Sequence, residues 1–246
     1  MKNKIGWCSA TWNPVWGCLN HCEYCYARKI AKFRWRQMYE IEFNHYWKKH
    51  PTWAWTGDHL SELKNFRPTF LEAQFDKKFP QKTQKIFVGS MSEIRFWKKD
   101  WIFKTFKRIK GYPQHIFQFL TKYPYIYHRL EFPAKAWLGF TITENKDLAN
   151  GILHIKKLRD LSLNGKYLYF VSIEPILEQI NPLDLIFLDW VILGAETGKR
   201  KGRITPRWHW IESIVKFCRD NDIPVYLKDS LKNIYPEEIK EFPNYK

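Results

Sequence analysis

Short apolar runs rich in β-branched and aromatic residues recur along the chain from residue 85 onward. Each run ends in small or polar residues and is followed by a segment with helical character. Near-continuous apolar strands that alternate with helices are typical of a parallel sheet covered on both faces. Together with a first strand expected over residues 5–13, the runs predict an α/β fold, an incomplete or distorted TIM-type (β/α) barrel with about six to seven parallel strands. The runs cover residues 85–90, 115–122, 136–142, 167–174, 189–196 and 223–228.

The chain before residue 85 is organised differently. A helical pattern over about residues 27–48 places apolar residues at roughly helical spacing, which predicts a buried face made of Ile30, Phe33, Met38, Ile41 and Tyr46. The opposite side is basic and would be either an ordinary solvated face or a track for phosphates. Residues 50–84 predict an irregular insertion with one or two short helices. We expect a single domain over residues 1–246, with a polar C-terminal tail from about residue 231.

Three of the five cysteines stand within eight residues, before the predicted long helix. Cys18, Cys22 and Cys25 have the spacing C-x3-C-x2-C. Soft thiolate ligands select zinc, copper(I) or iron–sulfur clusters. A cubane iron–sulfur cluster normally takes four cysteines, so three would leave one iron open to a substrate or cofactor. The competing interpretation is a zinc site whose fourth ligand is His21, Cys8 or a distant residue.

Composition adds a candidate partner. The formal net charge is +16, with 41 Lys and Arg against 25 Asp and Glu, and the chain holds 13 Trp, 13 Tyr and 18 Phe. Basic and aromatic side chains together suit a polyanion with unpaired bases, so nucleic acid is the first candidate. A lysine-rich coding bias with an aromatic-heavy core explains the same numbers. No apolar run reaches the ~20 residues of a membrane span, and no signal-peptide core is present, so we expect a reducing cytoplasm and no membrane.

Polar residues close most of the predicted strands. Parallel α/β barrels build their sites at the carboxyl ends of their strands, so these residues are candidates for one shared pocket. Capping of the following helices is the alternative for each of them. The candidates are Gly89, Ser90, Lys122, Thr141, Glu144, Ser172, Glu174, Glu196 and Lys228.

The cysteine spacing, with Tyr24 just before the last cysteine, resembles the signature of radical S-adenosylmethionine enzymes. Several segments in order are similar to a phage-associated family of radical-S-adenosylmethionine-like proteins of unknown function. They include residues 11–14, 17–27, 87–92, 120–122, 172–175 and 194–198 and a final Lys228. The chain departs from that pattern at Ala195, where a second glycine is expected, and at Asp229, which replaces the start of a Gln-Trp pair.

The resemblance implies a [4Fe–4S] cluster on Cys18, Cys22 and Cys25, with S-adenosyl-L-methionine chelating the open iron. Reductive cleavage of that cofactor would yield a 5′-deoxyadenosyl radical, with flavodoxin or ferredoxin as a candidate electron donor. By the same resemblance, Tyr24 contacts the adenine, and Gly89 and Ser90 meet the methionine amino group.

The remaining roles follow from the same comparison. Thr141 and Glu144 would contact the ribose, and Ser172 and Glu174 the nucleoside. Glu196 is a further cofactor-binding candidate, as its place in the matching segment implies. Lys122, Lys228 and Cys8 are the catalytic candidates. Lys122 is expected at the methionine carboxylate or the substrate, and Cys8 as a hydrogen-atom donor, although a buried inert thiol is the favoured interpretation of Cys8.

The sequence leaves two functions open. The first is a radical S-adenosylmethionine enzyme that modifies or repairs a substrate, with nucleic acid as a candidate. The second is a nucleic-acid-binding protein with a structural zinc or a non-catalytic cluster.

Overall fold

The structure is a computed structural model that describes residues 5–49, 57–161 and 167–244. The chain divides into two compact units, which are described separately. The N-terminal unit covers residues 8–117, and the C-terminal unit covers residues 118–246 together with the residues up to Trp7.

Seven of the described strands form one sheet, in the order β1-β4-β5-β6-β7-β8-β9. The pairs β1–β4, β5–β6, β6–β7, β7–β8 and β8–β9 are all parallel. The predicted α/β class and the predicted number of parallel strands are therefore confirmed. The strands are β1 (Ala10–Trp12), β4 (Lys85–Val88), β5 (Ile116–Thr121), β6 (Trp137–Ile142), β7 (Leu168–Ile173), β8 (Trp190–Leu193) and β9 (Val225–Leu227).

The N-terminal unit adds helices and a small second sheet to strands β1 and β4. The first strand is shorter than predicted, because the chain turns at Asn13-Pro14 and then pairs β2 with β3 in an antiparallel ladder. The described part of the predicted insertion contains α2, β3 and α3, while residues 50–56 lie outside the described residues. The elements are β2 (Val15–Trp16), α1 (Tyr26–Lys49), α2 (Gly57–Lys64), β3 (Thr69–Phe70), α3 (Glu72–Phe75), a 3-10 helix at Ile94–Phe96 and α4 (Lys99–Lys110).

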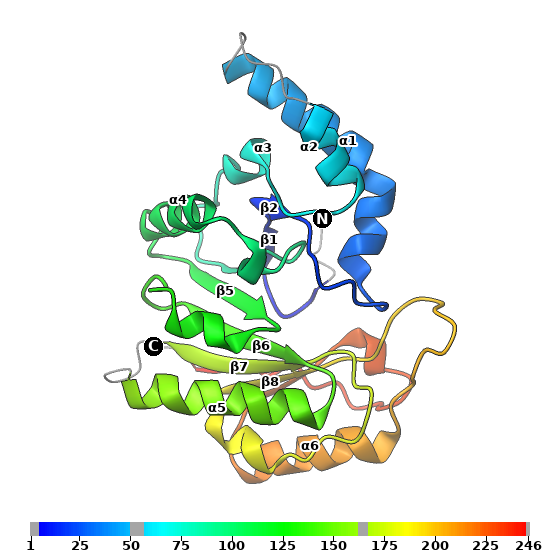
Figure 1. The fold of residues 1–246 in the computed structure, drawn as a ribbon. Coiled ribbons are helices and arrows are strands. Elements are labelled where there is room, and N and C mark those ends of the chain that lie inside the picture. The colour runs from blue at the N-terminus through cyan, green and yellow to red at the C-terminus, as the bar shows by residue number, and fades with distance from the viewer. Residues whose placement is uncertain (1–4, 50–56, 162–166, 245–246) are drawn as a thin grey trace. The chain divides into compact units, whose positions relative to one another are not determined.

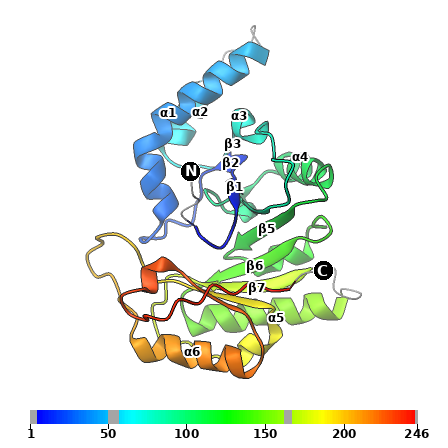
Figure 2. The ribbon, with the colours of Figure 1, turned by 180° about the vertical axis from the view of Figure 1, so that it is seen from behind.

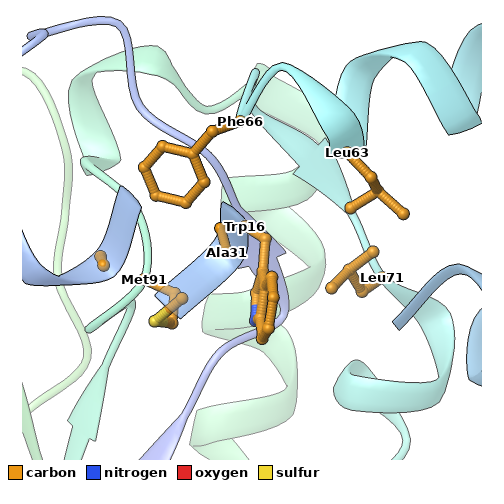
Figure 3. Close-up of a cluster of buried hydrophobic side chains, with 7 residues drawn as sticks. Trp16, Ala31, Leu63, Phe66, Leu71 and Met91 are labelled. Atoms are coloured by element: carbon orange, nitrogen blue, oxygen red, sulfur yellow. The ribbon is translucent and has the colours of Figure 1, made fainter. Parts of the chain in front are cut away.

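A compact hydrophobic cluster holds these elements together (Figure 3). It joins β2, α1, α2 and the segment after β4, so residues distant in sequence share one core. The cysteine loop borders it, because Cys18 and Cys25 pack against its edge. The buried members are Trp16, Ala27, Ala31, Leu63, Phe66, Leu71 and Met91.

Helix α1 forms where the sequence predicts it but buries a different face. Ala27, Ala31 and Glu42 are buried, whereas Phe33 is 84% exposed and Ile41 is 41% exposed. The predicted buried face was therefore wrong for Phe33 and Ile41. Small residues allow α1 to approach the core closely, and Met38 of the predicted face packs against that core as a partly buried side chain. The side chain of Tyr46 is outside the described part.

A buried carboxyl group in this unit, that of Glu42, lies at the start of α3. Its two carboxylate oxygens accept hydrogen bonds from the backbone N–H groups of Ala73 and Gln74, at 2.9 and 3.2 Å. These donors belong to the first turn of α3, whose own N-cap residue offers no side-chain bond. Burial raises the pKa of Glu42 to about 7, against the lowering effect of these two bonds.

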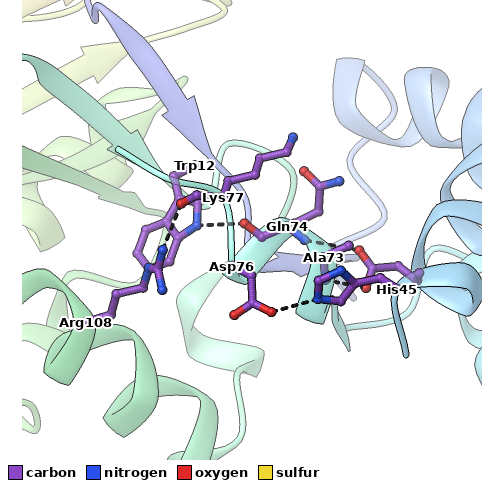
Figure 4. Close-up of polar contacts among 8 residues, drawn as sticks. Trp12, His45, Ala73, Gln74, Asp76, Lys77 and Arg108 are labelled. Carbon is purple, nitrogen blue, oxygen red and sulfur yellow. Dashed lines mark hydrogen bonds and ion pairs between the residues drawn. The ribbon is translucent and has the colours of Figure 1, made fainter. Parts of the chain in front are cut away.

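Neighbouring polar contacts extend the same network. Trp12 donates from its indole to the backbone of Gln74 at 3.0 Å, and Arg108 donates to the carbonyl of Lys77 at 2.9 Å (Figure 4). His45 and Asp76 form a 2.7 Å pair between α1 and the end of α3. Strand β1 and helices α1 and α4 therefore converge on the short α3 segment.

The C-terminal unit is built from β5–β9 and two long helices. Helices α5 (Asn145–Leu161) and α6 (Trp208–Asp220) lie on the same face of β6–β8 (Figures 1 and 2). Phe140 packs on α5, where a Cβ on Gly151 would come within 2.1 Å of its ring. Because side chains alternate along a strand, Thr141 faces the opposite side of the sheet.

The segment after β9 packs onto its own unit rather than forming a polar surface tail. A short 3-10 helix (Asp229–Leu231) follows the strand, and Leu231, Tyr235 and Ile239 are all buried. The backbone N–H of Leu227 donates to the carbonyl of Ile239 at 2.8 Å. A search of the described helices finds none that is both long and apolar enough to cross a membrane.

Candidate functional site

The cysteine loop is fixed at its start by backbone hydrogen bonds. The N–H of Gly17 donates to Met91 at 3.0 Å, and the N–H of Cys18 donates to Phe66 at 2.9 Å. Gly17 has φ +106°, and a Cβ there would lie 2.0 Å from the carbonyl oxygen of Arg67. Only glycine fits this position, because it combines a left-handed backbone with direct contact to another backbone segment.

All three thiols of the loop are free and half-buried. The sulfur of Cys18 accepts from the N–H of Asn20 at 3.4 Å, and the sulfur of Cys25 accepts from the N–H of Arg28 at 3.3 Å. Burial raises the pKa of Cys18 to about 11, with smaller raising effects from Glu93 and from Cys25 and Cys22. The loop therefore holds the Cys18 proton at neutral pH, and metal binding would displace that proton.

The donor set fits a thiolate-ligated centre by its chemistry, because two of the three sulfurs already accept backbone N–H bonds of the kind that support cluster thiolates. Among the described residues, however, no group of three or more His, Cys, Asp or Glu stands close enough together to hold a metal ion. The loop would thus have to draw its sulfurs together on binding. His21, a candidate fourth ligand in the zinc interpretation, is exposed and has a positive backbone φ of 51°.

Gly89 and Ser90 lie beside the cysteine loop in the same unit. Gly17 and Ser92 form an isolated parallel β-bridge shortly after the end of β4. The hydroxyl of Tyr26 donates to the carbonyl of Ser90 at 2.6 Å. The structure therefore brings together two of the cofactor-binding candidates and the loop of metal-binding candidates, which also carries the half-buried Tyr24.

Asn13 and Arg28 were not among the predicted site residues. Asn13 accepts from the Ser90 hydroxyl at 3.0 Å and from the Met91 N–H at 3.2 Å, so it shapes the turn after β4. Arg28 donates to the carbonyl of Cys18 at 2.9 Å and lies 5.1 Å from the Phe66 ring centroid. Its Nε is buried without a hydrogen-bond partner among the described residues. The sequence does not distinguish Arg28 from the other Lys and Arg residues of α1.

Cys8 lies at the other end of the β1–β4 pair. The N–H of Ser9 donates to Lys85 at 2.8 Å, at the start of β4, whereas Gly89 meets Trp12 at its end. Cys8 itself is buried. The structure therefore does not bring Cys8 to the cysteine loop.

Thr141 and Ser172 are neighbours in the C-terminal unit. They are paired in register on β6 and β7, on the sheet face opposite α5. Ser172 is 1% exposed, and its hydroxyl has no hydrogen-bond partner among the described residues. A buried hydroxyl without a partner carries a free-energy cost, so this position suits a polar ligand.

Glu174 and Lys228 form an ion pair at the ends of β7 and β9. Gly194, at the end of the intervening β8, makes room for it: a Cβ there would stand 3.1 Å from Lys228 Cδ and 3.2 Å from Glu174 Cδ. The two side chains are 28% and 20% exposed, so the pair is partly open to solvent. The structure therefore brings these two candidates together.

The remaining candidates in this unit serve local roles. Glu196 is held by Arg200 through two 2.8 Å bonds, and its side chain is 1% exposed. The carbonyl of Glu144 accepts the N–H of Asp147 in the first turn of α5, and its carboxylate pairs with Lys146 at 2.7 Å. The Glu144 carboxylate therefore makes a local ion pair at the start of α5, and Glu196 anchors the loop after β8. Lys122 is half-buried and directly follows β5.

Comparison with known proteins places the chain in one family. The model of a family described as "protein of unknown function (DUF5131)" matches residues 2–235. No curated protein and no solved structure matches the chain significantly. Since the match spans nearly the whole sequence, the chain belongs to the DUF5131 family.

Proposed function

We propose that this member of the DUF5131 family is a radical S-adenosylmethionine enzyme whose parallel sheet is an incomplete TIM-type barrel. The observation that supports it best is the anchoring of three free cysteines beside the turn after β4. Gly17 and Ser92 join the two segments, and Tyr26 bonds to Ser90. This arrangement places a thiol-rich loop at the carboxyl end of a parallel strand, where α/β folds build their sites.

Cys18, Cys22 and Cys25 would hold a [4Fe–4S] cluster, which when bound supplies the electron for reductive cleavage of S-adenosylmethionine. The chain's own part is to bind and orient. Asn13 fixes the turn that presents Gly89 and Ser90. Arg28 sets a cation against the carbonyl of Cys18, where it offsets the negative charge of thiolates.

In the C-terminal unit, the residues best suited to a nucleoside are Thr141 and Ser172. A ribose hydroxyl would supply the partner that the buried Ser172 hydroxyl lacks.

The test is anaerobic reconstitution of the full chain with iron and sulfide, followed by dithionite and S-adenosylmethionine. We expect about four irons per chain and the release of 5′-deoxyadenosine, with flavodoxin or ferredoxin able to replace dithionite. One tightly bound zinc and no iron would instead establish the structural-zinc alternative. A fully loaded cluster that releases no 5′-deoxyadenosine would reject the proposed activity.

A further inference from the structure

One face of α1 carries a continuous line of cationic and aromatic side chains. The positions are three or four residues apart, so they lie on one side of the helix. The line starts four residues after Cys25, and it spans about 27 Å at 1.5 Å per residue. We call it the α1 stripe; it consists of Lys29, Lys32, Arg36, Tyr39, Phe43 and Trp47.

The aromatic half of the stripe forms a stepped platform. The ring centroids of Tyr39 and Phe43 are 6.1 Å apart with an interplanar angle of 23°, and those of Phe43 and Trp47 are 6.2 Å apart at 17°. The rings are thus nearly parallel. Trp47 is 49% exposed, so the outer end of the platform is open to solvent.

The cationic half lies nearest the cysteine loop. Lys29, Lys32 and Arg36 are all exposed. In the whole of α1, seven Lys and Arg stand against two Glu, one of which is the buried Glu42. The stripe therefore presents positive charge next to the loop and the exposed ring of Trp47 at its far end, beyond the half-buried rings of Tyr39 and Phe43.

This combination favours a single-stranded nucleic acid as the occupant. A strand offers regularly spaced phosphates for the cations and base faces for the aromatic rings. A membrane surface fits less well, because an interfacial helix separates its cations from its apolar side chains, whereas this stripe has both on one face. At about 3.4 Å per stacked nucleotide, the stripe would span about eight nucleotides.

We propose that the α1 stripe binds a single-stranded nucleic acid and leads it toward the cysteine loop. As an assignment of the substrate class, this rests on the proposed function. Binding of the nucleic acid to the α1 stripe can be measured without cluster, reductant or S-adenosylmethionine. A stripe that does not bind nucleic acid and a protein without radical chemistry therefore give different results.

The experiment measures fluorescence anisotropy of labelled 15-mers of oligo-dT and oligo-U, with a 15-base-pair duplex for comparison, over a range of salt concentrations. The variant Lys29→Gln/Lys32→Gln/Arg36→Gln should bind at least tenfold more weakly and lower the slope of log K against log salt by about 2. Trp47→Ala should weaken binding about tenfold with an unchanged slope, because it removes stacking and no charge.

The matched control removes the same charge from another helix of the unit. Lys99, Lys107 and Lys110 on α4 are also exposed, and Lys99→Gln/Lys107→Gln/Lys110→Gln should bind nearly as wild type. Circular dichroism confirms that each variant is folded. Equal losses in the two triple variants would overturn the proposal, since they would reflect net charge alone.

Two further outcomes would also overturn it. If the stripe variants changed the oligomeric state in light scattering without changing oligonucleotide affinity, the stripe would be an interface between copies of the chain. If vesicles of phosphatidylserine bound more tightly than the oligonucleotides and lost that binding in the stripe variant, the partner would be a membrane surface.

Discussion

The candidate residues of the N-terminal unit and those of the C-terminal unit differ in what already holds them. The sulfurs of Cys18 and Cys25 each accept a backbone N–H, and the three cysteines of the loop are free thiols among the described residues. The carboxylates at the strand ends of the C-terminal unit are instead held by cationic side chains, as in Glu174–Lys228 and Glu196–Arg200.

That difference separates residues available for a ligand from residues committed to the fold. A thiol with a single backbone donor can exchange its proton for a metal without breaking an ion pair. A nearly buried carboxylate such as Glu196 cannot leave its arginine without an uncompensated charge. Four predictions test this contrast, from the largest expected effect to the smallest.

The largest effect should come from the cysteine loop. Cys18→Ala, Cys22→Ala or Cys25→Ala should each reduce the iron content after reconstitution from about four per chain to near zero, because the cluster loses a ligand. Cys8→Ala should keep its iron, since Cys8 lies at the other end of β1–β4. Iron and sulfide assays measure the outcome, and iron retained in Cys22→Ala would exclude the assigned ligand set.

The next effect concerns the backbone that positions the loop. Gly17→Ala should lower the free energy of unfolding by about 4 kcal/mol, from left-handed strain plus the clash with Arg67. Gly111→Ala is the control in the same unit, because a Cβ there meets only one carbonyl at 3.3 Å. Urea unfolding compares the two variants, and similar losses would mean that Gly17 is not specially constrained.

The third prediction tests the buried acid of α1. The folded pKa of Glu42 is about 7, above its ordinary value of 4.5, so the folded state binds the extra proton in this range. Its contribution to stability is present below pH 4.5 and is lost as the pH rises toward 7, by about 3 kcal/mol.

Glu42→Gln should flatten that part of the pH profile. The pKa values of His115, His128 and His154 are lowered, mainly by burial, so these groups change stability in the opposite direction. They are common to both proteins and cancel in the difference. Parallel profiles from urea unfolding at pH 4.5 to 8 would contradict the assignment.

The smallest effect is expected at the Glu174–Lys228 pair. A double-mutant cycle with Glu174→Gln and Lys228→Met should give a coupling free energy of about 1 kcal/mol, because the pair is partly shielded from water. The exposed Glu144–Lys146 pair serves as the control and should show no measurable coupling. Equal coupling in both cycles would remove the distinction between a committed and a solvated pair.

Several features follow from the sequence for local reasons. Apolar runs locate β4–β9 closely, because period and composition act over a few residues. The extent of α1 also matches its prediction. The clustering of Cys18, Cys22 and Cys25 needs no tertiary information, since their spacing alone keeps them on one loop.

Other features depend on contacts between distant residues. The bond from Ser90 to Asn13 joins positions 77 residues apart, and no local pattern specifies it. The same holds for Lys228 and Glu174, 54 residues apart, which only the parallel strand order brings together. The buried face of α1 likewise depends on distant residues, because the core against which the helix packs comes from other segments of the chain.

The sequence by itself thus determined the thiol-rich loop, the parallel strands and the polar character of their ends, because spacing and alternation are local properties. Only the tertiary structure decided which of those polar groups are held by the chain itself. A buried charged side chain finds its partner only when two particular helices, strands or loops pack together. Which of them pack together is set by packing across the whole unit.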